Sequence, residues 1–500
     1  MEQKFCFDDA VFTYAVAPEP LQRFSRHTPV LGGALTVSHT SKTEVRSAGR
    51  DGREIVIIGL CVDAHGEVER DGIPELILNQ PQRDPLPVYR FCDRFAGKYV
   101  ILYRNEEGVY LFGDATSSVQ MNYSLIEDSL CVASIDRLTA EYCGYDVSEY
   151  SLSIRKGAAS SQALPNDVTM YDKVKALLPN HYLDVSRGQA VRVSLDLPQD
   201  ISSKQEFHAA MERSAGLIRQ ITQEYVKYHS IVCPLTSGYD SRVVFVFLKK
   251  AVRRLSCFTF RHHFTDKDGD IWVPQKLCGE SAADHTLIED LSAETDYARA
   301  VKEIIGNYHS TNTIDRAYTL SYHFPGQATV GGDIIGQIGK TSLSGSIPVQ
   351  FATPSFFRCK IHNQAQAAKE ELRQYLSKIH ETADRRYVFD LFSLENRCGR
   401  WGAQGGMIYS VCSIATLNIF NCRELILTWF RIPRKLRVKK KIHYALIGRE
   451  DSQLLKTPFH PGEKFGFAAE IWPLLLLGTH AKYYVNCFLK TIRDRKEDHT

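Results

Sequence analysis

The sequence predicts an α/β protein of two domains, in which a layered, β-rich first part precedes a part where strands and helices alternate. Three observations predict this organisation. The chain has 500 residues, too many for one ordinary hydrophobic core. Short apolar runs typical of strands occupy the first two hundred residues, and a helical period begins near residue 205. A strand, a tight turn and a helix then follow at residues 231–248, the layout of an α/β nucleotide site.

The first part contains runs that alternate with turn residues. Residues 54–60, 98–103 and 109–112 are apolar and β-branched or aromatic, so each predicts a strand. Residues 105–108 join the last two runs and end in a glycine, which predicts a hairpin turn. Residues 178–185 predict a further strand. The pattern therefore indicates antiparallel layers.

A polar break at residues 197–203 places the domain boundary near residue 200, with domains at 1–200 and 201–500. Beyond it, apolar residues recur at three- and four-residue steps, and Ser203 is a candidate helix cap. These apolar positions are Phe207, Met211, Ala215, Ile218 and Ile221. A second strand and helix are expected at residues 255–260 and 272–278, and the chain beyond residue 387 is expected to be mostly helical.

Composition excludes several classes of protein. The net charge is only +3, from 61 basic and 58 acidic residues, which argues against a nucleic-acid partner. The one basic run, residues 434–441, is a candidate for binding polyphosphate, a membrane surface or nucleic acid, and the favoured interpretation is a solvated helix start that attracts ATP at most. The 13 cysteines form no Cys-x-x-Cys pair, so neither a disulfide framework nor a zinc site is expected and a cytoplasmic location fits best.

No transmembrane segment is expected. The start of the chain lacks the layout of a signal peptide, and the longest apolar stretch, residues 471–477, is too short to cross a bilayer. That stretch is interpreted as a buried helix or a contact with a partner protein. Whether the protein forms a homodimer is left open.

The chemistry is predicted from the turn after residue 234. Its small residues let the backbone approach an anion, and the following helix directs its N–H groups and positive dipole end at the same point. An acidic residue would repel phosphate directly, so Asp240 is expected to bind Mg²⁺, which then bridges phosphate oxygens. The expected nucleotide-binding residues of this loop are Leu235, Thr236, Ser237, Gly238, Tyr239, Asp240 and Ser241.

This run resembles the PP-loop of ATP pyrophosphatases, usually Ser-Gly-Gly-x-Asp-Ser, from which it departs at Thr236 and Ser237. Residues 330–336 resemble the second signature loop of the asparagine synthetase and β-lactam synthetase families. The resemblance implies ATP and Mg²⁺ as cofactors, with Asp240 and Asp333 as the two metal ligands and Gly331 and Gly332 beside the nucleotide.

Other segments occur in the order found in the same families. Phe258 and Thr259 resemble the strand beside the adenine, and Asp270 lies where the next helix of those families begins. Residues 417–423 resemble a late segment of those families. Lys456 lies in a Lys-x-x-Phe run whose lysine the resemblance assigns to the α-phosphate, with Lys464 as the substitute candidate.

The first part resembles the N-terminal nucleophile (Ntn) glutaminase domain of these families at residues 94–99, 114–118 and 178–182. The implied fold is a layered αββα domain followed by a PP-loop synthetase domain with added helices. A working glutaminase needs a Cys at position 2 whose own amino group acts as base, and here that residue is Glu2. The glutaminase is therefore expected to be degenerate.

The expected function is an ATP-dependent ligase that adenylates a substrate carboxylate and couples it to an amine without hydrolysing glutamine. Val330 stands where the related enzymes have an acid-base residue, so Glu395 and Tyr322 are the candidate bases. Two alternatives stay open. One is a glutamine-dependent asparagine synthetase after processing to Cys6, and the other is a catalytically inactive pseudoenzyme that binds a peptide or nucleotide.

Overall fold

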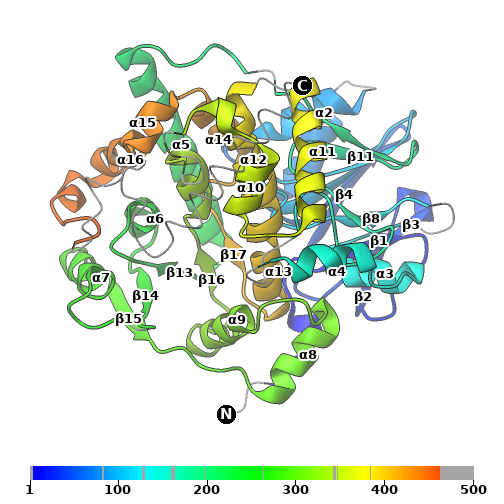
Figure 1. Ribbon diagram of the computed structural model, residues 1–500, viewed down its shortest axis with the longest axis horizontal. Coiled ribbons are helices and arrows are strands. Elements are labelled where there is room, and N and C mark those ends of the chain that lie inside the picture. The colour runs from blue at the N-terminus through cyan, green and yellow to red at the C-terminus, as the bar shows by residue number, and fades with distance from the viewer. Residues whose placement is uncertain are drawn as a thin grey trace.

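The computed structural model describes residues 4–80, 84–126, 130–158, 164–195, 197–262, 264–341, 345, 347–382 and 385–461. In this part of the chain three sheets are surrounded by many helices, which confirms the predicted mixed α/β class. In Figure 1 the parallel sheet, with β13 to β16, lies on the left, and the blue and cyan strands of the two antiparallel sheets lie on the right.

The two antiparallel sheets have six strands each. The first has the order β10-β8-β9-β1-β3-β2 and the second β12-β11-β7-β6-β5-β4. The first comprises β1 Tyr14–Ala17, β2 Arg26–Val30, β3 Leu35–His39, β8 Asn122–Ser124, β9 Cys131–Ala133 and β10 Lys175–Ala176. The second comprises β4 Val45–Arg50, β5 Arg53–Asp63, β6 Phe95–Arg104, β7 Val109–Gly113, β11 His181–Asp184 and β12 Gln189–Arg192.

The packing of strand β5 explains why its sequence is apolar at successive residues and does not alternate with polar ones. Val56 and Ile58 pack in a core shared with Val16 of the first sheet, so one face of β5 points between the sheets. Ile55 and Ile57 pack instead in a second cluster under α1 Ile73–Leu78 and α2 Pro85–Phe91. Both faces are buried, and so both carry apolar residues.

Short helices accompany these sheets. They include α3 Asp136–Cys143 and α4 Glu149–Lys156, together with the 3₁₀ turns η1 Phe7–Asp9, η2 Leu31–Gly33, η3 Arg70–Gly72 and η4 Cys92–Arg94. The predicted hairpin is confirmed, since Arg104 pairs with Val109 and the Asn105 N–H donates to the Gly108 carbonyl over 3.0 Å. The strand predicted at residues 178–185 is shorter, because Asn180 has a positive φ of 63° and turns the chain just before β11.

Between β12 and helix α5 Lys204–Tyr228 the chain passes from the antiparallel sheets to the second part. Ser203 caps α5 as predicted, and Glu206 completes a capping box with it. The chain then builds a parallel sheet of order β15-β14-β13-β16-β17. Its strands are β13 Ile231–Pro234, β14 Ser256–Phe260, β15 Asp284–Ile288, β16 Ala328–Val330 and β17 Thr416–Leu417.

Helices alternate with these strands and then dominate the rest of the described chain. Those between the strands are α6 Tyr239–Ala251, α7 Gly269–Glu280, α8 Thr295–Ile305, α9 Thr311–His323, α10 Pro354–Lys360, α11 Gln366–Thr382, α12 Val388–Phe392 and α13 Ala403–Val411. After β17 come α14 Arg423–Phe430, α15 Arg434–Val438 and α16 Lys441–Asp451. Two π-helices, η5 Ile335–Gly339 and η8 Ser393–Gly402, and the 3₁₀ turns η6 Val349–Phe351, η7 Arg385–Tyr387 and η9 Ser452–Leu455 complete the set.

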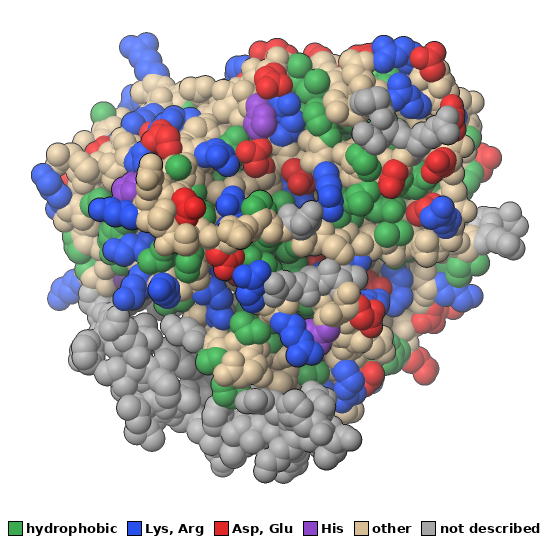
Figure 2. Space-filling view, turned by 90° about the horizontal axis from the view of Figure 1, so that it is seen from above, with side chains coloured by type: hydrophobic (Ala, Val, Ile, Leu, Met, Phe, Trp, Pro, Cys, Tyr) green, Lys and Arg blue, Asp and Glu red, His purple; other side chains and the backbone are tan. Residues whose placement is uncertain are grey.

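The two parts are joined by backbone as well as side-chain contacts. Ala96 of β6 forms an antiparallel bridge with Cys422, and the Asn421 side chain donates to the Gly97 carbonyl over 2.6 Å. The largest apolar cluster runs through both parts without interruption. None of the helices in the described ranges has the length and apolarity that crossing a membrane requires. Figure 2 shows basic and acidic side chains interspersed over one face, as the nearly balanced charge predicts.

Candidate functional site

The candidate site lies where the order of the parallel sheet changes direction. From β13 the chain builds outward to β14 and β15 on one side, and then returns to place β16 and β17 on the other. Because β13 and β16 are parallel neighbours, their carboxyl ends lie at the same edge of the sheet. Loops that leave such a switch point in opposite directions open a crevice in which α/β proteins bind ligands. The loops here are residues 235–238 and 331–334.

The first loop is held by its own small side chains. The Leu235 N–H still donates to the Phe258 carbonyl of β14, after which the chain turns away from the sheet. The Thr236 N–H donates to the Ser241 hydroxyl over 3.2 Å, and the Gly238 N–H donates to the Thr236 hydroxyl over 3.2 Å. Gly238 then caps helix α6, as the strand, turn and helix pattern predicts.

Asp270 accepts a hydrogen bond from a loop N–H that was expected to donate to pyrophosphate. Its Oδ1 accepts from the Ser237 N–H over 2.8 Å and from the Ser237 hydroxyl over 2.6 Å. The sequence reasoning assigned these loop N–H groups to phosphate, whereas in this structure protein oxygens accept from them. A pyrophosphate here would rely on hydroxyls and nearby cations more than on the Ser237 N–H.

Asp240 lies in the first turn of α6 and is paired with two side chains. Its Oδ2 accepts from Lys340 over 2.5 Å, and its Oδ1 accepts from His443 Nε2 over 2.8 Å. Burial opposes ionisation of Asp240, but the hydrogen bonds and the charge of Lys340 outweigh it and lower its pKa. Burial lowers the pKa of His443 as well, although the hydrogen bond and the charge of Asp240 oppose that shift.

Asp333 follows β16 directly and reaches solvent at the same edge. Its Oδ1 accepts from the Asn418 amide over 2.7 Å, and Asn418 itself follows β17. Burial of its surroundings raises the pKa of Asp333, and the neighbouring charge of Asp240 acts in the same direction. The two predicted metal ligands are therefore close enough to repel each other.

Two glycines permit this approach. A Cβ added at Gly336 would lie 2.8 Å from Asp240 Oδ2, and one added at Gly332 would lie 3.1 Å from the Asp240 carbonyl oxygen. Any side chain at either position would push α6 away from the second loop. Gly331 continues the sheet, since its N–H donates to the Leu417 carbonyl over 2.9 Å.

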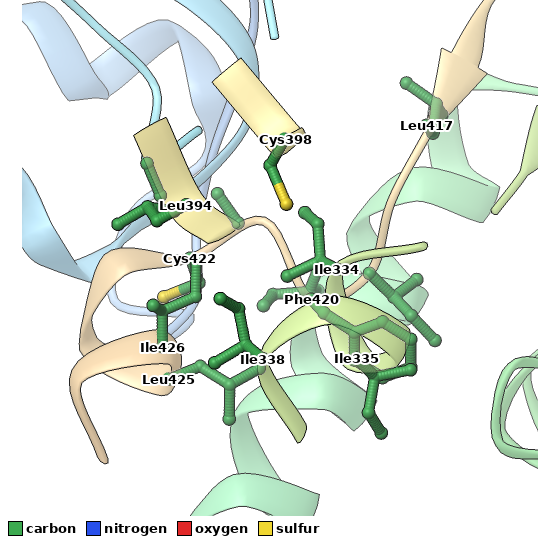
Figure 3. Packing of buried hydrophobic residues seen from close by; sticks show 14 of the residues in the cluster. Ile334, Ile335, Ile338, Leu394, Cys398, Leu417, Phe420, Cys422, Leu425 and Ile426 are labelled. Atoms are coloured by element: carbon green, nitrogen blue, oxygen red, sulfur yellow. The ribbon is translucent and has the colours of Figure 1, made fainter. Parts of the chain in front are cut away.

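The second loop rests on a dense apolar core. Figure 3 shows Ile334, Ile335 and Ile338 packed near Cys398 of η8 and Phe420, with Ile426 of α14 close by. Ile335 and Ile338 are fully buried. Asp333 is thus an exposed carboxylate on a rigid base, which is the arrangement that holds a ligand in a fixed place.

Lys456 lies on the segment that covers the first loop. Arg242 of α6 is fully buried and donates to the carbonyls of Ser237, Leu454, Thr457 and Pro458. Phe459 stacks on Tyr239 with ring centroids 4.1 Å apart. Lys456 is an exposed side chain of this segment, and the His460 N–H donates to the Ser237 carbonyl over 3.4 Å. The substitute candidate Lys464 lies outside the described residues, as does the apolar stretch 471–477.

The expected adenine strand is β14, next to the first loop. Phe258 is buried in its own apolar cluster, and the Thr259 hydroxyl donates to the Leu235 carbonyl over 2.7 Å. Both residues therefore hold the first loop against β14. The exposed end of the strand instead carries Phe260 stacked on His262, with ring centroids 5.3 Å apart.

Glu395 is not placed with the two aspartates. It is fully buried in η8, where it accepts from Arg192 over 2.6 Å, from Tyr375 over 2.7 Å and from Asn180 over 2.7 Å. Although burial opposes ionisation, the charge of Arg192 lowers the pKa of Glu395. These contacts make it a buried link between the two parts. The other candidate base, Tyr322, is an exposed side chain on α9.

Lys98 is a functional candidate that sequence reasoning missed. It enters from β6 of the second antiparallel sheet, is only 4% exposed, and donates to the Thr416 hydroxyl of β17 over 3.1 Å. Burial lowers its pKa to about 8, while the charges of Asp114 and Asp333 act against that shift. Its position beside the sheet edge depends on a contact between distant segments, which no local pattern reveals.

Lys340, His443 and Asn418 were also missed. Each pairs with a predicted metal ligand from another element, and their only signal was residue type. The basic run is partly structural, because Arg437 is buried against Asp390, whereas Lys440 lies over the Tyr239 ring at 5.6 Å. Lys340 and Lys440 therefore bring positive charge to the first loop.

No protein-family model matches the sequence, and no curated protein matches it. Within the described ranges, no group of three or more His, Cys, Asp or Glu side chains could hold a metal ion by itself. Two carboxylates from two loops nevertheless fit Mg²⁺, which commonly takes one or two protein carboxylates and completes its shell with phosphate oxygens and water.

Proposed function

We propose that this protein is an ATP-dependent ligase that activates a substrate carboxylate as its acyl-adenylate and transfers the acyl group to an amine. The observation that carries the proposal is the pairing of Asp240 and Asp333 at the carboxyl ends of β13 and β16. The two antiparallel sheets are compatible with an Ntn-like αββα domain, and the parallel sheet that follows them is compatible with a PP-loop domain.

In the proposed reaction, a carboxylate oxygen attacks the α-phosphorus of ATP and the bond to pyrophosphate breaks. The amine then attacks the acyl carbon, AMP leaves, and the amine loses a proton, so that the products are an amide, AMP and pyrophosphate. Bound Mg²⁺ would neutralise charge on the phosphate oxygens. Asp240 and Asp333 would hold it, while Thr236 and Ser241 contribute hydroxyls.

Cationic side chains of this chain supply the remaining charge stabilisation. Lys340 pairs with Asp240, and with a metal ion bound to that carboxylate its ammonium group would be available to phosphate oxygens. Lys456 is an exposed side chain of the segment that covers the first loop, and it is the proposed partner of the α-phosphate. The base that accepts the proton of the amine is left unassigned, because Glu395 is enclosed by its own partners.

ATP–pyrophosphate exchange tests the proposal directly. Purified protein is assayed with Mg²⁺, ATP, labelled pyrophosphate and a panel of amino acids and dicarboxylic acids, with hydroxylamine in parallel to trap activated acyl groups. We expect acid-dependent exchange that falls by about 100-fold or more in Asp333→Asn. The matched control Asp296→Asn changes an exposed aspartate of α8 that pairs with Arg299 and should leave exchange unchanged.

Exchange that survives in Asp333→Asn would contradict the proposal. If ATP binds but no acid supports exchange, the pseudoenzyme becomes the better interpretation. Release of glutamate from glutamine would instead favour the asparagine synthetase alternative, for which Cys6, exposed at the start of η1, is the nucleophile to test.

A further inference from the structure

A buried lysine of the first part reaches the parallel sheet of the second part. Lys98 belongs to β6, and its neighbours on the same face of that strand, Ala96, Val100 and Leu102, all pack in the largest apolar cluster. Lys98 is only 4% exposed at a position where an apolar side chain would be expected. Burying an ammonium group is costly, so packing alone does not account for this residue.

The amino group of Lys98 is lightly held. Within the described ranges, Nζ has one hydrogen bond, which it donates to the Thr416 hydroxyl over 3.1 Å. It also lies 5.3 Å from the centre of the Phe12 ring. The carboxylates whose charges act on it are Asp114 and Asp333. One hydroxyl partner leaves this nitrogen able to form further hydrogen bonds with a ligand.

The Thr416 contact places Lys98 beside the carboxyl edge of the parallel sheet. Thr416 begins β17, and Asn418 follows the end of that strand. The Asn418 amide donates to Asp333 over 2.7 Å. Residues two apart on an extended chain are separated by about 7 Å. One short segment therefore carries the partners of both Lys98 and Asp333.

Two glycines of one helical turn indicate the same proximity. Gly402 and Gly406 are four residues apart, which is about 6 Å along a helix. A Cβ added at Gly402 would lie 3.8 Å from Asp333 Oδ2, and one added at Gly406 would lie 3.2 Å from Lys98 Nζ. The carboxylate and the amine therefore lie near the two ends of this turn.

The charges of the two groups also affect each other. Burial is the main influence on Lys98 and lowers its pKa to about 8, while Asp114 and Asp333 oppose that shift. Lys98 in turn lowers the pKa of Asp333, against the larger effect of burial. A lysine in this range is present both as an ammonium ion and as a neutral amine, and the neutral amine accepts protons.

We infer that Lys98 is the catalytic base that accepts the proton of the amine during amide formation. The inference rests on the proposed function and assigns the proton transfer left open there. The amine nitrogen forms a bond to the acyl carbon, a proton passes from that nitrogen to Nζ of neutral Lys98, and AMP leaves with the electron pair of the broken acyl–oxygen bond. Lys98 then returns the proton to water. The first part thereby supplies a reactive group to a site built by the second.

A comparison of the two half-reactions in the full-length protein tests the inference. ATP–pyrophosphate exchange is measured with the acid that supports it best, and amide formation is measured from that acid with ammonium, methylamine or glycine at a fixed concentration of free base. Hydroxylamine, which is already unprotonated at neutral pH, is a further acceptor. Lys98→Met removes the base, whereas Lys98→Arg keeps a cation that cannot accept a proton. Lys175→Met, at an exposed lysine of β10 paired with Asp167, is the matched control.

We expect the ratio of amide formation to exchange to fall by about 100-fold in both Lys98 variants, as for loss of a general base. Both rates come from the same folded molecules, so this ratio does not depend on the folded fraction. Hydroxylamine trapping should fall by less than about tenfold, and the control should match wild type. In wild type, amide formation should rise with pH up to about 8 and then level off, because Lys98 must be neutral, and both variants should lose this dependence.

Two outcomes of this comparison would overturn the inference. One is an unchanged ratio of amide formation to exchange in Lys98→Met. The other is recovery of amide formation in Lys98→Arg, because a positive charge beside Asp333 would then be sufficient.

A direct titration of Lys98 does not depend on catalysis. Protein labelled with carbon-13 at the lysine Cε is titrated without ATP and followed by NMR, and the signal missing from Lys98→Met identifies the residue. We expect a midpoint near pH 8. A midpoint near the ordinary value of about 10.4 would overturn the inference, because Lys98 would then be an ammonium ion at neutral pH.

The two proposals fail separately. Absence of exchange with every acid, or exchange without transfer to any amine, would count against the ligase and the base together. Exchange and amide formation that both persist in Lys98→Met would count against the base alone.

Discussion

Two sets of carboxylates in this protein have opposite surroundings. Asp240 and Asp333 lie at the open edge of the parallel sheet, and their partners are one lysine, one imidazole and one amide. Glu395 lies between the two parts and accepts from a guanidinium, a phenol and an amide with no exposed surface. A carboxylate that is satisfied inside the protein holds structure together, whereas one at an open edge can exchange its partners for a ligand.

The largest expected effect comes from Asp240→Asn. Neutralising this side chain removes a proposed ligand for Mg²⁺ but keeps an oxygen for His443, so ATP–pyrophosphate exchange should fall by about 1,000-fold. The free energy of unfolding should change by less than about 1 kcal/mol, because the ion pair with Lys340 is partly exposed. Urea denaturation measures the second quantity, and Asp266→Asn, an exposed aspartate paired with Arg261, is the control.

A large loss of stability in Asp240→Asn, with normal exchange per folded molecule, would contradict the prediction, because Asp240 would then behave as Glu395 is expected to behave. The open-edge aspartate would then be structural.

Glu395→Gln should lower stability and leave exchange unchanged, the opposite of what is expected for Asp240→Asn. It leaves Arg192 buried without its anion, which is expected to lower the free energy of unfolding by about 3 kcal/mol. Exchange per folded molecule should be retained. Thermal and urea denaturation measure the loss, with Glu370→Gln on the surface of α11 as the control.

Glu395 is also the residue that the sequence suggested as a base, and this variant separates the two roles. Normal stability and normal exchange, combined with loss of amide product, would identify Glu395 as the base.

The smallest effect concerns pH near the Glu395 cluster. Burial, followed by the charge of Arg192, lowers the pKa of His181 to about 4, against about 6.5 in an unfolded chain. Between these values the unfolded state binds a proton that the folded state does not, so stability falls as pH falls from 6.5 to 4. At pH 5 the loss should be about 2 kcal/mol relative to pH 7.

His181→Asn should remove this acid dependence, since Asn does not titrate and can still donate to the Pro179 carbonyl. Urea denaturation at pH 5 and pH 7 measures the difference in the free energy of unfolding between the two pH values. An equal loss in wild type and variant would show that His181 does not report on the buried cluster, and the groups at the open edge would then be the next to examine.

Local patterns predicted much of the fold. Four local features were predicted: the long apolar run of β5, the hairpin after β6, the Ser203 cap, and the strand, turn and helix at residues 231–248. All depend on neighbours in sequence, and the helix of the last feature is longer than predicted, ending at Ala251. The strand order was not predicted, because it depends on which distant strands pair. The π-helices were missed as well, since an amphipathic stretch has nearly the same apolar spacing as an α-helix.

In the candidate site, too, local patterns predicted some features, and those that depend on distant contacts were missed. Asp240 and Asp333 could be named from glycine-bearing turns, but the residues that hold them could not. Lys340 lies 100 residues from Asp240 and His443 lies 203 residues away. Such contacts follow from the topology of the sheet, and a lysine or histidine carries no local mark of them. Glu395 was a reasonable base by residue type, and only its burial argues for a structural role.

Arg242 has a consequence for how the chain matures during synthesis. Its guanidinium contacts the carbonyl of Ser237 and also those of residues 454–458, made more than two hundred residues later. A nascent chain that has passed the first loop therefore contains the Ser237 carbonyl but lacks the three later carbonyls that accept from Arg242. The first loop therefore reaches its final form only after translation has proceeded past Pro458.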